Sequence, residues 1–177
     1  MDFLKLTEQR YSCRDYDESR AVEREKLDYI LSAARLAPSA CNGQPYLISV
    51  CEGEAARRVA EATRGVGINN FAKEAPLVLV ISERPYTATA ALGAKLKKND
   101  YRSLDIGILS AYITSAAFEI GLGSCILGWF DDAAIREICS LEHPVRLVIT
   151  LGYPKDTVKI PEKKRKSKDE LIKFIEG

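Results

Sequence analysis

Two arginines flank a hydroxyl near the N-terminus, at Arg10, Ser12 and Arg14 of the segment RYSCR. In an extended segment alternate residues point to the same side, so both guanidinium groups and the hydroxyl would form one row. Arginine can bind a phosphate through two parallel hydrogen bonds, so such a row suits a phosphate group. The alternative is a surface strand whose arginines are simply solvated, as most surface charges are.

A second polar segment runs from Ala37 to Pro45 and reads APSACNGQP. Two prolines enclose small and amide residues, a composition typical of a tight loop. Asn42 and Gln44 each offer a donor and an acceptor, which would match the carbonyl and imide edge of a heterocycle. A plain turn between a helix and a strand would explain the same residues equally well.

Helices and strands in mixed order must position these two segments. Apolar spacing predicts helices over residues 23–37, 54–64 and 104–120, and shorter ones over 133–139, capped by Asp131 or Asp132, and around 169–175. Apolar β-branched runs predict strands over 46–50, 76–81 and 145–151, and a short strand or loop over 125–128. The irregular alternation favours an α+β fold with helices on both sides of a sheet.

Three regions carry further expectations. Residues 83–99 contain Pro85, Gly93 and a lysine cluster, and they are predicted to form a long loop. The 104–120 helix has charges only near its ends, so it must be buried in the core or in a subunit interface. Residues 159–168 hold six basic residues and one acid, which on charge alone favours a solvated tail.

Composition narrows the class of protein. A length of 177 residues favours one domain over residues 1–177, and a net charge of +1 gives no field to attract nucleic acid or an anionic membrane. Without a long apolar run or a signal peptide, the expected location is the cytoplasm. The five cysteines include no C-x-x-C pair, so the sequence predicts neither a disulfide framework nor a metal site.

RYSCRDY, followed one helix later by APSACNGQPY, resembles the N-terminal signature of the nitroreductase family of FMN enzymes. NNFAKEAP, GLGSCILGWF and ITLGYP then follow in the family's order, so the resemblance covers nearly the whole chain. It implies a three-layer α/β/α sandwich with a mostly antiparallel central sheet. It also implies a homodimer with FMN at the interface, on which the basic extension 153–177 packs against the partner subunit.

The resemblance implies a cofactor site made by both subunits. One subunit would supply Arg10, Ser12, Arg14, Asn70, Lys73, Leu127, Gly128 and Arg165, with Lys163 beside Arg165 at the phosphate. The other would supply Pro38, Ser39, Ala40 and Asn42, and Gln44 of the same loop is also an expected contact.

The implied activity is hydride transfer from NADH or NADPH, through flavin N5, to a small organic acceptor such as a quinone or nitroaromatic compound. The flavin carries the chemistry, so no catalytic side chain is expected. Arg14 and Lys73 would give electrostatic support, and a backbone N–H of Leu127 or Gly128 could bind N5. The alternatives are a flavin-binding or sensing protein without turnover, a specialised relative such as a reductive dehalogenase, or a small domain for another anion.

Overall fold

The computed structural model describes residues 2–176 and is built on a four-stranded sheet with the order β1-β2-β4-β3. The strands are β1 (Tyr46–Glu52), β2 (Leu77–Glu83), β3 (Gly123–Leu127) and β4 (Val145–Gly152). Each neighbouring pair is antiparallel. The predicted α+β class and antiparallel sheet are therefore confirmed.

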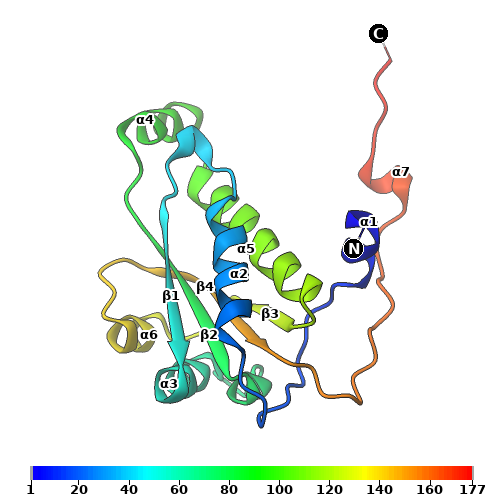
Figure 1. Cartoon of the computed structure of the whole chain (residues 1–177). Helices are drawn as coiled ribbons and strands as arrows, with labels where there is room; N and C mark the ends of the chain where they lie inside the picture. Colours follow the sequence, from blue (N-terminus) through cyan, green and yellow to red (C-terminus); the bar gives the residue numbers. More distant parts are fainter. Residues whose placement is uncertain (1, 177) are drawn as a thin grey trace.

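Helices cover both faces of the sheet, which makes the three layers of the expected sandwich (Figure 1). On one face Leu79 and Ile149 pack with α2 (Arg24–Arg35) and α5 (Tyr101–Glu119). On the other face Val78, Val80 and Val148 pack with α3 (Gly53–Thr63) and α6 (Asp132–Cys139). Because β2 is buried on both faces, its sequence is apolar without alternation, as the sequence predicts.

The helix ends follow from local chemistry. The Asp131 carboxylate accepts the Ala134 N–H at 3.0 Å and begins α6, whereas Asp132 accepts the Val145 N–H at 2.7 Å. Asp100 caps α5 in the same way, and Gly121, with φ of +83°, follows its end. Among residues 2–176 no helix has the length and apolarity to cross a lipid bilayer.

The prediction of a loop over residues 83–99 is wrong, because α4 (Ala88–Lys97) lies within it. Pro85 precedes this helix, and Gly93 lies inside it beside the Tyr101 ring, so neither residue interrupts it. The helix α1 (Phe3–Gln9) is not among the helices predicted from the sequence. The last helix, α7 (Lys168–Leu171), ends earlier than expected, and Ile172 is already extended.

Candidate functional site

The two basic segments of the chain meet at one cavity. Residues 10–14 are extended, and Ser12 forms an isolated parallel bridge with Ser124 of β3. Cys13 is fully buried whereas Ser12 and Arg14 are exposed, which is the alternation that the sequence predicts. Arg10, Ser12 and Arg14 line a cavity of about 210 Å³ together with Lys163 and Arg165 from the basic extension.

Most of the charged side chains at this cavity are positive and repel one another. Burial lowers the pKa of Lys163, and the nearby positive charges of Arg10 and Arg165 lower it further. The Lys163 ammonium donates a hydrogen bond to the carbonyl oxygen of Thr7. Within residues 2–176 no salt bridge neutralises Arg10, Arg14, Lys163 or Arg165. Such a group of unneutralised cations favours a bound anion.

Four further residues line the same cavity without being singled out by the sequence: Tyr11, Pro161, Glu162 and Lys164. Burial, with the Cys13 thiol beside it, raises the pKa of Tyr11 to about 12. Nothing in the spacing of these residues distinguishes them from ordinary surface residues, so only the fold identifies them.

Asn70 and Lys73 lie beside the 10–14 segment on a short 3₁₀ turn, η2 (Asn70–Glu74). The Arg14 guanidinium carbon is 6.0 Å from the centre of the Phe71 ring on this turn. Lys155 ties the two segments together, because its ammonium binds Asp15 at 2.6 Å and Glu74 at 3.2 Å.

The side chains of Asn70 and Lys73 line a second cavity, of about 190 Å³. Arg64 Nε donates to Asn70 Oδ1 at 3.0 Å, so the Asn70 amide is already oriented within the chain. Lys73 remains exposed.

Leu127 is the last residue of β3, and Gly128 follows it. The Leu127 side chain is buried with the α3 and α6 layer, so only its backbone can reach a ligand. Gly128 is exposed, and a Cβ atom added there would meet no atom within 4 Å. The segment that carries Arg14 lies against β3, because the Cys13 N–H donates to the Ser124 carbonyl at 2.9 Å. Burial raises the pKa of the Cys125 thiol on this strand, and the Arg14 charge opposes the shift.

The loop 38–45 lies elsewhere and has an unusual backbone. Cys41, Asn42 and Gln44 have φ of 51°, 52° and 40°, a region that residues other than glycine rarely adopt. Ser39 Oγ accepts the Gln44 N–H at 3.0 Å, and the Gln44 amide donates to Asn42 Oδ1 at 2.6 Å. The expected contacts of this loop are exposed or half-buried: Pro38, Ser39, Ala40, Asn42 and Gln44.

The expected site residues therefore fall into two groups within one chain. The loop 38–45 lies near α4 and the first turns of α5, whereas the basic cavity lies near α1 and the C-terminal extension, towards the other end of α5 (Figure 1). One chain does not bring the loop to the cavity.

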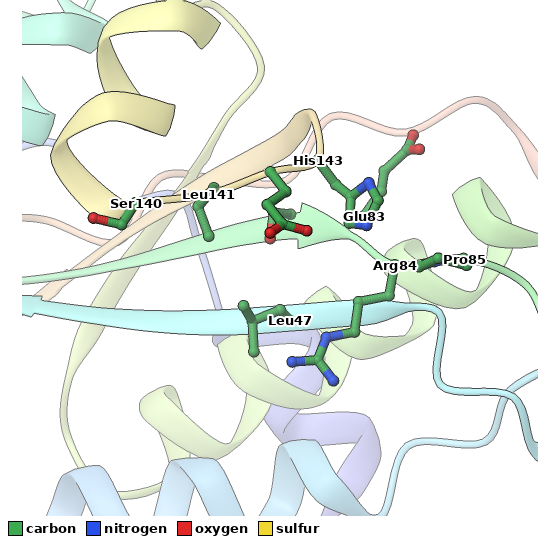
Figure 2. A pocket seen from close by; sticks show the side chains of 9 residues that line it. Leu47, Glu83, Arg84, Pro85, Ser140, Leu141 and His143 are labelled. Atoms are coloured by element: carbon green, nitrogen blue, oxygen red, sulfur yellow. The ribbon is translucent and has the colours of Figure 1, made fainter.

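Another cavity, of about 400 Å³, contains none of the expected residues. Figure 2 shows its lining side chains, among them Leu47, Arg84 and His143, around the ends of β1 and β2 and the segment after α6. Its half-buried carboxylate, Glu83, is already neutralised by Arg102 and Arg146. Size alone therefore gives no reason to place the chemistry there.

Comparison with known proteins gives one consistent result. The model of the nitroreductase family matches residues 7–153. A protein from Archaeoglobus fulgidus, provisionally named an NADH dehydrogenase/NAD(P)H nitroreductase, is 33% identical, and the alignment covers 86% of each chain.

Two solved structures extend this result to the fold. An FMN-dependent nitroreductase from Clostridium difficile R20291 is 29% identical, with a TM-score of 0.75 over 99% of this chain and 100% of that one. A nitroreductase family protein from Streptococcus pneumoniae TIGR4 is 21% identical, with a TM-score of 0.81 over 98% of this chain and 100% of that one.

Proposed function

Because the chain belongs to the nitroreductase family, we propose that it is an FMN-dependent oxidoreductase that uses NADH or NADPH to reduce a small organic acceptor, such as a quinone or nitroaromatic compound. The observation that carries this proposal is the cavity where Arg10, Arg14, Lys163 and Arg165 meet without a salt bridge among residues 2–176. Similar proteins are named an FMN-dependent nitroreductase in C. difficile and an oxygen-insensitive NADPH nitroreductase in Helicobacter acinonychis.

The basic cavity fits the phosphate of FMN. A phosphate dianion would relieve the repulsion that lowers the pKa of Lys163. Arg10 and Arg165 offer planar donor groups that can bind phosphate oxygens in pairs, and the exposed Ser12 hydroxyl can donate a further hydrogen bond. Because these residues come from both ends of the chain, the phosphate would also hold the extension against the 10–14 segment.

The neighbouring residues fit the rest of the cofactor. FMN, when bound, would supply the redox chemistry that connects the nicotinamide donor to the acceptor. Arg14 and Lys73 place positive charge beside the site, which stabilises negative charge on a reduced ring. The open space at Gly128 admits a flat ligand close to the backbone, so that an N–H of this segment can donate to it.

We propose that a second copy of the chain completes the site. The loop 38–45 cannot reach the basic cavity of its own chain, so it would serve the cavity of the partner. α5 carries exposed apolar side chains at Leu104, Ile108 and Tyr112, and beside it an open cavity of about 350 Å³ is lined partly by α1 and α2. A symmetric pair of chains would bury this face and build two equal sites.

The C-terminal segment supports the same assembly. After α7 it runs away from the rest of the chain (Figure 1), and Phe174 and Ile175 are 75% and 85% exposed. Neighbouring apolar side chains that are exposed in one chain often mark a protein–protein interface. The start of the extension 153–177 packs on its own chain, because Tyr153 is only 6% exposed and Lys155 binds Asp15 and Glu74. We propose that the segment after α7 packs on the partner subunit.

The deciding experiment is the visible spectrum of the purified protein, followed by anaerobic addition of NADH or NADPH. A flavin spectrum that bleaches with one of these donors is the expected result, and it identifies the donor. A flavin spectrum that does not bleach would favour a binding or sensing role. A colourless protein that also fails to take up added FMN would overturn the proposal.

A further inference from the structure

Asp105 is a buried carboxylate on an otherwise apolar stretch of α5. The residue is only 3% exposed, and its Oδ1 accepts the backbone N–H of Ala40 at 2.9 Å. Its Oδ2 is buried and has no hydrogen-bond partner among residues 2–176. Burying a carboxylate with a single hydrogen-bond partner costs free energy. A favourable interaction of Asp105 elsewhere must offset this cost.

The loop that Asp105 contacts has a strained backbone. Ala40 begins the turn η1 (Ala40–Asn42), and Cys41, Asn42 and Gln44 follow with positive φ. Each such residue costs free energy and persists only where surrounding contacts fix the backbone. Two hydrogen bonds join the loop to itself, one accepted by Ser39 Oγ from the Gln44 N–H and one donated by the Gln44 amide to Asn42. At the end of the loop the Pro45 carbonyl accepts the Arg84 N–H at 2.9 Å.

The Asp105 contact joins the start of the turn to the core. Asp105 lies one turn from the cap of α5, and the next turn of this helix, at Ile106 and Leu109, is packed on the sheet. Tyr46, the first residue of β1, also lies near it, since burial and the Asp105 charge raise the pKa of Tyr46. The carboxylate therefore sits where the loop, α5 and β1 meet.

We propose that Asp105 is the positioning residue of the loop 38–45, holding it in the strained conformation that contacts FMN on the partner subunit. This inference rests on the proposed function. The hydrogen bond to Ala40 fixes the start of the turn, and the internal hydrogen bonds of the loop then propagate that conformation to Asn42 and Gln44.

A second role for the same charge must be separated from this one. A carboxylate near the start of a helix also interacts favourably with the helix dipole. Asp105→Asn removes the charge but keeps an oxygen that can accept the Ala40 N–H. Asp105→Ala and Asp105→Leu remove both, and the leucine preserves the side-chain volume if alanine impairs folding.

The test combines hydrogen–deuterium exchange of residues 39–44 with FMN titration of the whole protein. In Asp105→Ala or Asp105→Leu we expect faster exchange in the loop and FMN affinity weakened by about tenfold or more, from the loss of a charge-assisted hydrogen bond. Asp105→Asn should remain within about threefold of the wild type, since a neutral acceptor retains most of that interaction. Thr114→Val is the control, because its buried hydroxyl bonds only within α5.

Each outcome has a distinct meaning. Unchanged exchange of the loop in Asp105→Ala and Asp105→Leu would overturn the inference whether or not FMN binds. Faster exchange with unchanged FMN affinity would also overturn it, and equal losses in the asparagine and alanine variants would assign the effect to charge. A wild-type protein that binds no FMN would instead overturn the proposed function, while the exchange data would still decide whether Asp105 holds the loop.

Discussion

Arg10 and Arg165 come from opposite ends of the sequence and line one cavity. Each can make charge-assisted hydrogen bonds to a phosphate, worth about 1.5–3 kcal/mol apiece. We expect Arg10→Ala combined with Arg165→Ala to weaken FMN binding by at least about 100-fold, measured by quenching of flavin fluorescence. The pair Lys166→Ala and Lys168→Ala removes two charges from the same extension outside the cavity and should have little effect. A double variant that purifies with full flavin would contradict the phosphate site.

Glu23, at the start of α2, forms a hydrogen bond with Tyr153, which follows β4. Tyr153 donates a hydrogen bond to Glu23 at 2.6 Å, and this bond lowers the pKa of Glu23 from its ordinary value of 4.5. A carboxyl pKa that is lower in the folded state stabilises the fold above pH 4.5, and the contribution is lost as the pH falls through the lowered value.

We therefore expect Tyr153→Phe to reduce the free energy of unfolding at pH 7 and to make much less difference at pH 3. Urea unfolding at the two pH values measures both effects. The variant keeps the ring that contacts Arg20 and Lys26, so only the hydroxyl is lost. An equal difference at both pH values would show that the hydrogen bond to ionised Glu23 is not responsible.

Among the elements, α6 offers the clearest test of a helix cap. Asp131 accepts the Ala134 N–H at 3.0 Å, and the helix begins directly after it. Asp131→Ala should lower the free energy of unfolding by about 0.5–2 kcal/mol, as measured by urea denaturation. Asp131→Asn retains an oxygen acceptor and should cost much less; a similar loss in both variants would point to the charge of Asp131 instead.

The elements also show which features a sequence can and cannot predict. The alternation at 10–14 and the unbroken apolar run of β2 are properties of neighbouring residues, and both predictions are confirmed. The sequence left Asp131 and Asp132 as alternative caps, because the choice depends on Val145, which binds Asp132. The sequence does not predict α4, because Gly93 and the lysine cluster indicate a loop more strongly than its alanines indicate a helix.

The candidate site was harder to predict than the fold. The positive φ values of Cys41 and Gln44 have no local signal, because such residues rarely adopt this conformation, whereas Asn42 is of a type that is enriched there. Asp105 appeared in the sequence only as a charge near a helix end, and its contact with Ala40 depends on how α5 packs beside the loop. The assignment of Arg10 and Arg165 to one phosphate came from the family resemblance, and the cofactor contacts remain a prediction.

At the scale of the whole molecule, the helix α5 has two different faces. Ile106, Leu109 and Ile113 pack against the sheet, whereas Ile108 and Tyr112 on the other face are 38% and 40% exposed. The sequence alone predicts burial of this helix either in the core or in a subunit interface. Within one chain only the face that packs on the sheet is buried. The proposed dimer would cover the second and would bring each loop 38–45 to the partner's basic cavity.

In this arrangement FMN binding requires the dimer, because each cofactor site includes residues of both subunits. Ile108→Arg places a charge at the exposed face of α5, where burial against a second copy would leave it unpaired. We expect this variant to be monomeric in light scattering and to have lost FMN, although Ile108 lies outside the basic cavity. Ala133→Arg adds the same charge on α6, across the sheet, and should remain a flavin-loaded dimer. A flavin-loaded monomer would overturn the shared site, since one chain alone would then hold FMN without the loop of its partner.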